Sequence, residues 1–484
     1  MENAGRSVAD LIAARFGSGS RVIVYSGTGR NGGDGMVAAR HLAGRNFNIV
    51  VRLVGSSKTI TDPIVRQNWL ALKSMTASTK IEECGDSSLL SKTESDVLVD
   101  AVLGTGAKGK LRQPILRAVQ AMNESGGFKV AVDVPTGIDS DTGEVLGEAV
   151  HANLTATFHA TKPGLSKARD FCGEINVIDI GIPPEAYIYV GPGDVEAVRI
   201  RRPPGAHKGQ YGRLLIIGGS GTFSGAPALV ALAAYRTGTD LAFIAAPEKT
   251  AHAISSISPT LITLKLQGDN LAPGHVDALR EHIEKATAIA IGPGLGGSPK
   301  TMSAVRRVLT IVRQLKKPLL VDADALNALG VIRKRVFHEL TVLTPHAGEF
   351  KVIAGKAPSI DLTARSNEVK AMAGKSGGIT VLKGDTDVIS DGERVKLNRT
   401  GNPGMTVGGT GDVLSGIISG LLAQGIGPFR AAAAGAFISG ASGDLAEEEL
   451  GYHLTPTDIL DHIPKVMNDP MCHKAIYEKR LRSL

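Results

Sequence analysis

Short apolar segments recur along the whole chain and alternate with helix-like segments, and this alternation restricts the fold more than any other feature of the sequence. Buried strands that are separated by helices form parallel, doubly wound sheets. The sequence therefore predicts an α/β fold in both halves, with ligands bound at the carboxyl ends of the strands. The predicted strands are 21–25, 48–54, 96–102, 129–134, 213–217, 241–245, 287–291, 318–321, 340–343 and 379–382.

The segment 199–212 (RIRRPPGAHKGQYG) interrupts this pattern. It holds several charges, two prolines and three glycines and has no apolar periodicity, which is typical of a connection between domains. A chain of 484 residues is also long enough for two domains of ordinary size. We predict a first domain at 1–198 and a second at 199–484. The predicted helices include 34–44, 411–423 and 429–447.

Composition narrows the class of protein. Hydrophobic residues make up 43% of the chain and charged residues 21%, as in an ordinary globular protein. The net charge of +7 favours anionic small molecules such as nucleotides, but there is no dense block of Lys and Arg and only 4% aromatic residues, so we expect no nucleic-acid partner. The most apolar segment, 413–429, is broken by Gly, Ser, Gln and Pro, so we expect no membrane span.

Three distant cysteines (Cys84, Cys172 and Cys472) and the lack of a signal peptide favour reduced thiols in a cytoplasmic protein.

A glycine-rich loop, GTGRNGGDG beginning at Gly27, follows the first predicted strand. Gly27, Gly29 and Gly32 match the dinucleotide-binding fingerprint, in which glycines let a pyrophosphate approach the backbone. That fingerprint also needs an acid about 20 residues further on for the ribose, and the next strand offers Arg52 instead. Asp34 would in addition repel a phosphate at the start of the helix. The loop therefore does not predict a pyrophosphate cradle.

Two further loops begin with aspartates, Asp100 in DAVLGTGAKGK and Asp133 in DVPTGID. Each aspartate ends a predicted parallel strand, so together with Asp34 they are expected at one edge of the sheet. Oxygen-rich loops of this kind suit a hard cation, and a carboxylate there can move a proton next to a ring carbon. Alternatively, each aspartate only caps the turn or helix that follows it. The residues alone leave both interpretations open.

Four motifs of the first half occur in the order MENAG, NGGDG, DAVLGTG and VDVPTG. Over about residues 1–195, the chain resembles the NAD(P)H-hydrate epimerase domain. The resemblance implies a Rossmann-like fold and a potassium ion held by Asn31, Asp100 and Thr136. It gives Asp133 the acid/base role at the hydrated carbon. It also implies substrate contacts from Asn31, Gly32, Gly33, Asp34, Gly104, Thr105, Gly106, Ala107, Lys108, Gly109, Lys110 and Asp133.

The chain departs from this family's pattern at three points. Arg30 stands where the family usually has a second asparagine. Thr136 stands where the family usually has serine, and threonine keeps the oxygen ligand. The family normally has a short helix before MENAG, where this chain begins, and we expect that helix to matter for dimer contacts and for the epimerase.

In the second half, the run GMTVGGTGD at 404–412 precedes a helix of small residues. Free backbone N–H groups and the helix dipole at such a glycine-rich N-terminus stabilise a transferring phosphoryl group. Asp412, in the first turn, is placed to take the proton from the accepting hydroxyl. Gly409, Gly411 and Asp412 together therefore predict an anion hole with a base. The alternative is a glycine-rich segment that only packs against another helix.

Two motifs upstream also follow predicted strands, TPHAGE and LKGDTD. His346 and Glu349 are three residues apart and can share one helical face. Glu349 is a candidate to hold magnesium through water, and His346 either contacts the substrate or is structural. Lys383 offers a point charge to a phosphate. The loops IGGS, GPGLGG and VDADALN end strands as well and are expected at the same face.

The ordered set GPGLG, VDADALN, TPHAGE, KGDTD and GMTVGGTGD, within about residues 205–465, is similar to the ribokinase-like superfamily and, within it, to the NAD(P)H-hydrate dehydratase. This resemblance implies magnesium as a cofactor and, in prokaryotic forms, ADP in preference to ATP as the phosphoryl donor. The implied nucleotide contacts are Lys383, Gly384, Asp385, Thr386, Asp387 and Gly411. The implied contacts to the hydrated nicotinamide are Ala226, Gly294, His346 and Asp412.

Together the two resemblances imply repair of hydrated NADH and NADPH. The first domain would interconvert the R and S forms, and the second would phosphorylate and dehydrate the S form with release of AMP and phosphate. We expect a homo-oligomer. Two alternatives stay open: a kinase of the same superfamily for vitamin precursors, and a scaffolding or RNA-linked module without catalysis. The kinases more often have asparagine where His346 stands, and a scaffold has no need for the three aspartates of the first half. Residues after about 465 match no motif.

Overall fold

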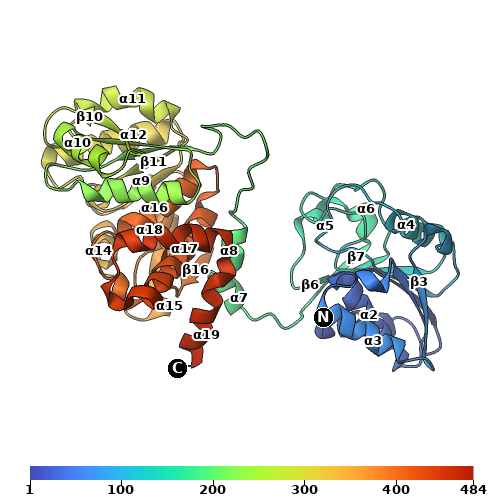
Figure 1. Ribbon diagram of the computed structural model, residues 1–484. Coiled ribbons are helices and arrows are strands. Elements are labelled where there is room, and N and C mark those ends of the chain that lie inside the picture. Colours follow the sequence, from blue (N-terminus) through green and yellow to red (C-terminus); the bar gives the residue numbers. More distant parts are fainter. Residues whose placement is uncertain (483–484) are drawn as a thin grey trace. The chain divides into compact units, whose positions relative to one another are not determined.

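The structure is a computed structural model that describes residues 1–482. The chain folds into two compact units, Met1–Pro183 and Pro184–Leu484 (Figure 1). Both units contain a sheet covered by helices, which confirms the predicted α/β fold.

The last part of the first predicted domain carries two short helices, α7 (Glu185–Ile188) and α8 (Pro192–Glu196), which belong to the second unit of the structure. Tyr189, between them, forms a β-bridge with Leu397 of the second unit. The predicted boundary between residues 198 and 199 stays a prediction.

The first unit holds a seven-stranded sheet in the order β3-β2-β1-β4-β5-β6-β7. Every pair of neighbouring strands is parallel, and the chain starts in the middle and winds to both sides, as in a Rossmann-like fold. The central strands are buried on both faces because apolar residues occupy nearly every position. The strands are β1 (Arg21–Ser26), β2 (Asn48–Val54), β3 (Thr79–Cys84), β4 (Val97–Ala101), β5 (Phe128–Val132), β6 (Leu154–Phe158) and β7 (Glu174–Ile178).

The helices of this unit cover the sheet, and α2 is the one that shapes the site. It begins at Arg30, earlier than the predicted start at residue 34. Glycines allow this early start, because a Cβ at Gly32 would overlap the carbonyl oxygen of Gly27 and a Cβ at Gly35 would overlap Ala101. The helices are α1 (Glu2–Ala13), α2 (Arg30–Ala43), α3 (Pro63–Lys73), α4 (Ile115–Glu124), α5 (Pro163–Lys167) and α6 (Arg169–Cys172), with 3-10 turns at Ser57–Thr59 and Ser87–Leu89.

The second unit holds a nine-stranded sheet in the order β10-β9-β8-β11-β12-β13-β14-β15-β16. The strands up to β14 are parallel, and the last two add a hairpin-like antiparallel edge. The strands are β8 (Arg213–Ile217), β9 (Leu241–Pro247), β10 (Ile262–Leu266), β11 (Ala288–Ile291), β12 (Leu319–Val321), β13 (Thr341–Leu343), β14 (Ile379–Leu382), β15 (Asp387–Ser390) and β16 (Val395–Asn398).

Two glycines let a pair of helices of this unit pack closely. Gly416 and Gly420 of α16 face α9, and a Cβ at Gly420 would lie 2.9 Å from the Cα of Ala234. The helices are α9 (Gly225–Arg236), α10 (Glu248–Ile257), α11 (His275–Lys285), α12 (Pro299–Gln314), α13 (Asp324–Asn327), α14 (Ala347–Ala354), α15 (Leu362–Ser376), α16 (Thr410–Ala423), α17 (Pro428–Leu450), α18 (Pro456–Asn468) and α19 (Lys474–Arg482), with 3-10 turns at Pro403–Met405, Gly451–His453 and Pro470–His473.

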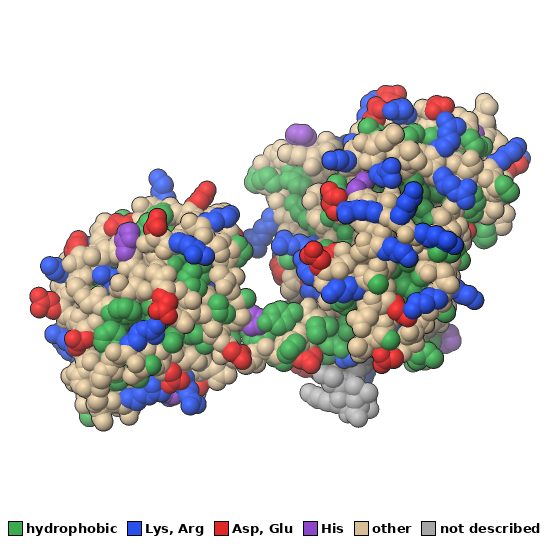
Figure 2. Space-filling view, turned by 180° about the vertical axis from the view of Figure 1, so that it is seen from behind, with side chains coloured by type: hydrophobic (Ala, Val, Ile, Leu, Met, Phe, Trp, Pro, Cys, Tyr) green, Lys and Arg blue, Asp and Glu red, His purple; other side chains and the backbone are tan. Residues whose placement is uncertain are grey.

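The structure also shows the state of the cysteines, the character of the helices and the distribution of surface charge. All three cysteines are free. Among residues 1–482, no helix combines the length and the apolar character that crossing a membrane requires. On the face drawn in Figure 2, Lys and Arg side chains are interspersed with Asp and Glu.

Candidate functional site

The first unit has a cavity of about 430 Å³ at the carboxyl ends of its central strands β1, β4 and β5. Parallel strands bring their following loops together at this edge, so the three motif loops of the first half share one site. The cavity is lined by Gly27, Thr28, Gly29, Arg30, Asn31, Asp34, Val54, Val102, Leu103, Gly104, Thr105, Gly106, Ala107, Ile115 and Asp133.

Asp133 directly follows β5 and has a φ of 67°. A non-glycine residue pays strain for this left-handed backbone, and such strain is concentrated at functional sites. Its carboxylate forms an ion pair with Lys162, and only 14% of the Asp133 side chain and 18% of the Lys162 side chain are exposed. The Lys162 ammonium also donates to Thr157 Oγ1 at 2.9 Å and to the Phe158 carbonyl at 2.8 Å. Asp133 is therefore held at the cavity wall by a nearly buried lysine.

Lys162 is a site residue that the sequence analysis missed. It lies beyond β6, the strand next to β5 in the sheet, so the sheet order brings it to Asp133 across 29 residues of chain. The available signal was a lysine close behind a buried strand in the motif HATKPG.

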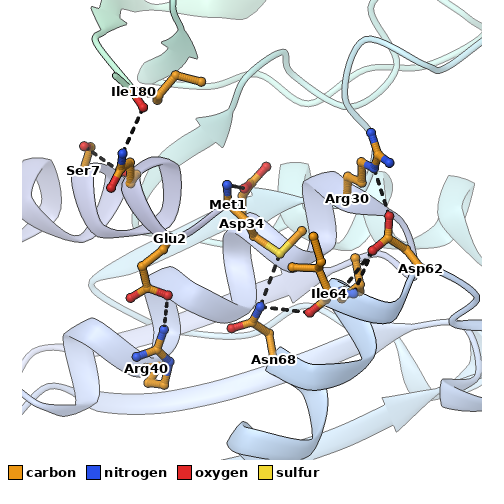
Figure 3. Close-up of polar contacts among 12 residues, drawn as sticks. Met1, Glu2, Ser7, Arg30, Asp34, Arg40, Asp62, Ile64, Asn68 and Ile180 are labelled. Atoms are coloured by element: carbon orange, nitrogen blue, oxygen red, sulfur yellow. Dashed lines mark hydrogen bonds and ion pairs between the residues drawn. The ribbon is translucent and has the colours of Figure 1, made fainter. Parts of the chain in front are cut away.

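Asp34 lies in α2 and also lines the cavity. Burial is the main reason that its pKa is raised to about 7; the nearby amino group of Met1 lowers the pKa and the carboxylate of Asp133 raises it further. Figure 3 shows Asp34 beside Met1, with 3.9 Å between the amino nitrogen and Oδ1. In the same view Arg30, the departure from the family's asparagine, points away to Asp62, the N-cap residue of α3, at 2.9 Å.

Behind the cavity lies a cluster of oxygen atoms around Asp100. Asp100 is 1% exposed, and its carboxylate accepts hydrogen bonds from the hydroxyl of Thr136 at 2.6 Å and from its backbone N–H at 2.7 Å. Burial raises the pKa of Asp100 to about 6, against the lowering effect of these hydrogen bonds. The Thr136 hydroxyl also contacts the carbonyl of Leu103 at 3.4 Å, and the amide oxygen of Asn31 lies against the neighbouring Gly104.

This cluster fits a monovalent cation. Its donors are one carboxylate and neutral oxygens, and a buried carboxylate without a positive partner is stabilised by a cation. Within the described residues, no group of three His, Cys, Asp or Glu side chains is arranged to hold a metal ion. The buried Nδ2 of Asn31 has no hydrogen-bond partner, so this amide has capacity left for a ligand.

Five of the predicted substrate contacts do not line the first cavity. Gly32 and Gly33 pack inward, against Gly27 and against the side chains of Met1 and Val65. Lys108 forms ion pairs with Asp139 and Asp141, both at 3.0 Å. The five residues outside the lining are Gly32, Gly33, Lys108, Gly109 and Lys110.

The second unit has a cavity of about 480 Å³ between the loop after β14, the segment 398–406, the start of α16 and the face of α17. It brings together five of the six predicted nucleotide contacts, and Thr386 is not among its lining residues. The lining residues are Lys383, Gly384, Asp385, Asp387, Asn398, Thr400, Gly401, Asn402, Pro403, Met405, Thr406, Thr410, Gly411, Leu414, Ala436, Ser439 and Gly440.

Lys383 lies at the edge of this cavity, between the carboxylates of two other residues. Its ammonium lies 3.0 Å from the carboxylate of Asp322 and 4.0 Å from that of Glu349. Asp322 is 2% exposed and also accepts from the Ser415 hydroxyl at 2.6 Å. The carboxylates raise the pKa of Lys383 against the opposing effect of its burial, so the lysine is charged. Asp322 lies in the motif VDADALN and is a second partner that the sequence analysis did not identify.

Asp412 lies in the first turn of α16, after Gly409, whose φ of 104° favours glycine. Burial is the largest cause that raises the pKa of Asp412 to about 7. The charge of Asp322 raises it further, Lys383 lowers it, and Glu349 raises it. A carboxylate with a pKa near neutrality is suited to take a proton at physiological pH. Its position at a helix N-terminus also places it where phosphoryl oxygens would bind.

His346 and Glu349 form a capping box at the start of α14. The ring Nδ1 of His346 accepts from the backbone N–H of Gly348 at 3.0 Å and of Glu349 at 3.3 Å, and the Glu349 carboxylate accepts from the His346 N–H at 2.8 Å. Glu349 is nearly buried, and desolvation raises its pKa. The buried carboxylates of Asp322 and Glu349 and the partly exposed Asp412 thus all act electrostatically on Lys383. Within the described residues no three such side chains are arranged around a metal ion, so Glu349 could hold magnesium only through water.

Ala226 and Gly294 lie close to each other, since a Cβ at Gly294 would be 3.4 Å from the Cβ of Ala226. Ala226 is in the first turn of α9, which packs with its N-terminus beside that of α16. The loop of Gly294 is tied to Asp324 through the N–H of Gly296 at 2.8 Å, and Asp324 acts electrostatically on Asp412. The predicted contacts for the hydrated nicotinamide therefore lie around the N-terminal ends of α9 and α16.

Comparison with known families agrees with the division of the chain into two units. The family model described as NAD(P)H-hydrate dehydratase matches residues 214–465, and the one described as YjeF-related protein N-terminus matches residues 1–164. The chain is 45% identical over 476 residues to the bifunctional NAD(P)H-hydrate repair enzyme Nnr of Hyperthermus butylicus, covering 97% of this chain and 88% of the relative. The protein of the same name from Pyrobaculum aerophilum is 46% identical over 477 residues, covering 96% and 93%.

Solved structures resemble the chain over a shorter length. A hypothetical protein from Streptococcus mutans is 28% identical with a TM-score of 0.51, covering 58% of this chain and 99% of that one. A ribokinase-like superfamily protein from Enterococcus faecalis is 26% identical with a TM-score of 0.50, covering 58% and 95%.

A Rossmann-like unit and a ribokinase-like unit, each with a carboxylate–lysine site, define a two-domain α/β enzyme. The match to the relatives extends over nearly the whole chain. The chain belongs to the family of bifunctional NAD(P)H-hydrate repair enzymes, which combine an epimerase with a dehydratase.

Proposed function

We propose that this protein repairs hydrated NADH and NADPH, by epimerisation in the first unit and ADP-dependent dehydration of the S form in the second. The observation that carries the proposal is Asp412 in the first turn of α16, in the electrostatic environment of the partly buried Lys383, in the unit that matches the dehydratase family. This is the arrangement that phosphoryl transfer to a hydroxyl requires: a base, a positive charge and free helix N–H groups.

For the epimerase, Asp133 is the proposed acid/base at C6, the ring carbon that carries the hydroxyl and is bonded to the ring nitrogen. Asp133 accepts the hydroxyl proton while the bond from C6 to nitrogen breaks, and the ring nitrogen takes a proton from Asp34. Reversal after rotation about the freed carbon closes the ring with the opposite configuration. Lys162 holds Asp133 in place, and the raised pKa of Asp34 supports a proton donor at neutral pH.

Asn31, Asp100 and Thr136 are the proposed potassium ligands. The buried Asp100 carboxylate supports a cation at these oxygen atoms, and the unpartnered amide nitrogen of Asn31 stays available to donate a hydrogen bond to the substrate. When bound, potassium would supply positive charge to the loops that contact the substrate. The residues proposed to contact the substrate are Asn31, Gly32, Gly33, Asp34, Gly104, Thr105, Gly106, Ala107, Lys108, Gly109, Lys110 and Asp133.

For the dehydratase, Asp412 takes the proton of the C6 hydroxyl as the hydroxyl oxygen accepts the terminal phosphoryl group of the nucleotide. Phosphate then leaves C6 with its bonding electrons, the ring nitrogen lone pair compensates, and loss of a proton from C5 restores the dihydronicotinamide. With ADP the nucleotide product is AMP. Ala226, Gly294 and His346 are the proposed contacts to the hydrated ring.

The proposed nucleotide contacts are Lys383, Gly384, Asp385, Thr386, Asp387 and Gly411. Lys383 supplies charge to the phosphates, and the cavity that most of these residues line is supporting geometry. Glu349 is proposed to hold magnesium through water, where the ion would neutralise the transferring phosphoryl group. We further propose ADP rather than ATP as the preferred donor, a homo-oligomer in the cytoplasm, and no nucleic-acid or membrane partner.

The test is to incubate the full chain with a mixture of R and S hydrated NADH, magnesium, potassium and either ADP or ATP, and to follow NADH by its absorbance. Complete recovery of NADH with release of phosphate supports both activities, and the faster nucleotide identifies the donor. The Asp133→Asn variant should stop at the S fraction, and Asp412→Asn should recover NADH more slowly, by about 10²-fold or more. No recovery with either nucleotide by the unmodified protein would refute the proposal.

A further inference from the structure

The segment beyond α18 folds back onto α17, outside the residues that the dehydratase family model matches. It places His473 at the side of Asp444, with 2.7 Å between the ring Nε2 and Oδ2. Both side chains are buried, with 5% of the His473 side chain and none of the Asp444 side chain exposed. The ring edge of Phe437 packs against His473 at 5.8 Å between centroids. Because a carboxylate only accepts, His473 Nε2 is the donor of this hydrogen bond.

Asp444 connects this pair to the second cavity. Its Oδ2 accepts from the backbone N–H of Gly401 at 3.1 Å, and its Oδ1 accepts from the side-chain amide of Asn402 at 3.0 Å. The same amide donates to the carbonyl of Gly443 at 2.9 Å. Gly401 and Asn402 line the same cavity as Lys383. The carboxylate therefore joins the cavity wall to α17.

The cavity wall is also packed tightly against α17. A Cβ at Gly440 or at Gly443 of α17 would overlap Thr400 or Met405, both of which line the cavity. Glycine at these positions lets the segment 400–405 lie flat on the helix, so its position follows that of α17 and of Asp444. A further hydrogen bond, which the side-chain amide of Asn398 donates to the carboxylate of Asp387 at 2.9 Å, fixes the chain just before residue 400.

We propose that His473 is a positioning residue for nucleotide binding: it holds the Asp444 carboxylate in the orientation that fixes Gly401 and Asn402 in the cavity wall. The inference rests on the proposed nucleotide site. Without His473, the buried Asp444 loses one of the hydrogen bonds that orient its carboxylate, so its contacts to Gly401 and Asn402 are held less firmly. Binding of the nucleotide then includes the cost of ordering the segment 400–405.

The test compares the full chain with His473→Ala and His473→Gln. Glutamine can donate to Asp444 from nearly the same place and should restore binding. His462→Ala is the matched control, because His462 of α18 also faces a carboxylate of α17, that of Glu449 at 3.5 Å, but neither residue lines the cavity. ADP with magnesium is titrated by calorimetry, KM for ADP and kcat are measured for dehydration, and hydrogen exchange is followed in peptides that contain residues 400–405.

We expect His473→Ala to raise Kd and KM for ADP about tenfold with kcat within about twofold, to speed exchange in these peptides, and to leave epimerase activity unchanged. His473→Gln and His462→Ala should resemble the unmodified protein. Unchanged Kd and exchange in His473→Ala, or an equal loss in His462→Ala, would overturn the inference. If His473→Ala does not fold, Asp444→Asn provides the same test, because it keeps the size of the side chain but removes one acceptor. If the unmodified protein binds no nucleotide, the proposed function fails, and hydrogen exchange alone decides whether His473 orders the wall.

Discussion

Replacement of Asp412 by asparagine should have two opposite effects, loss of dehydration and gain of stability. The substitution removes the proton acceptor at the start of α16 while it keeps the size of the side chain. General-base catalysis typically contributes about 10²–10⁴-fold to a rate, so dehydration should fall by this factor at pH near 7. Epimerisation takes place in the other unit and should not change.

The gain of stability follows from the raised pKa of Asp412, which is about 7 in the folded protein against an ordinary value of 3.8. A carboxyl whose pKa is raised on folding binds protons more tightly in the folded state, so ionising it destabilises the fold as pH rises from about 4 to about 7. At 1.36 kcal/mol for each pKa unit, the cost is about 2 kcal/mol at pH 5 and about 4 kcal/mol at pH 8. Asparagine does not ionise. The stability of Asp412→Asn relative to the unmodified protein should therefore grow by about 2–3 kcal/mol between pH 5 and pH 8.

Calorimetry of the full chain at the two pH values measures this difference. The only tryptophan, Trp69, lies buried in the first unit, so its fluorescence identifies the unfolding transition of that unit, which should not shift. Asp461→Asn is the matched control, because this aspartate is 72% exposed on α18. The reasoning is refuted if Asp412→Asn still dehydrates hydrated NADH at the normal rate, or if its advantage in stability does not grow with pH.

Four further predictions address the other groups of the two sites. Lys162→Met should lower epimerisation about 10²-fold or more and leave dehydration of pure S substrate intact, as separate assays of the two activities would show. Lys383→Ala leaves buried carboxylates unpaired and should destabilise the second unit by about 3–5 kcal/mol, measured by denaturation, and abolish binding of ADP in a titration. Thr136→Val removes the hydroxyl that donates a hydrogen bond to Asp100 and that is a proposed potassium ligand. The epimerase of this variant should therefore no longer be faster in KCl than in NaCl. In one buffer series, epimerisation should fall and dehydration should rise as pH passes through about 7, because Asp34 acts as an acid and Asp412 as a base; parallel profiles would contradict these roles.

The central strands could be predicted from the sequence, because residues buried on both faces of a parallel sheet form continuous apolar runs. Strands such as β1 and β8 were predicted to within one residue of their observed ends. The edge strands β3, β7 and β10 and the interior strand β6 were missed. β6 (LTATF) is buried at every position, but its two threonines interrupt the apolar run. β3 (TKIEEC) and β10 (ITLKL) have partly exposed positions, so their sequences contain charges that hide the pattern. The hairpin of β15 and β16 is short and follows a glycine loop, which the sequence analysis interpreted only as a ligand contact.

The sites, like the strands, could be predicted from the sequence only in part. Motif loops that follow central strands were correctly expected at one sheet edge, because strand order alone brings them together. Asp322 and Lys383 are 61 residues apart, and Asp133 and Lys162 are 29 apart. Their pairing depends on which strands are neighbours and on side-chain direction, and neither can be derived from a single sequence. The capping role of His346 is local, yet histidine is an uncommon N-cap residue, so the motif indicated a ligand contact more readily.

The two units share one arrangement of charged side chains at their sites. Each has one carboxylate in contact with a nearly buried lysine, Asp133 with Lys162 and Asp322 with Lys383. Each also has a second carboxylate in the same electrostatic environment, Asp34 or Asp412, without that direct contact and with a pKa raised to about 7. The lysine holds one carboxylate in place, and burial leaves the other carboxyl group able to gain or lose a proton near neutral pH. Two unrelated sheets therefore present a carboxylate fixed by a lysine and a carboxyl group that exchanges a proton at the carboxyl ends of their strands, which is what chemistry at a carbon bearing a hydroxyl next to nitrogen requires.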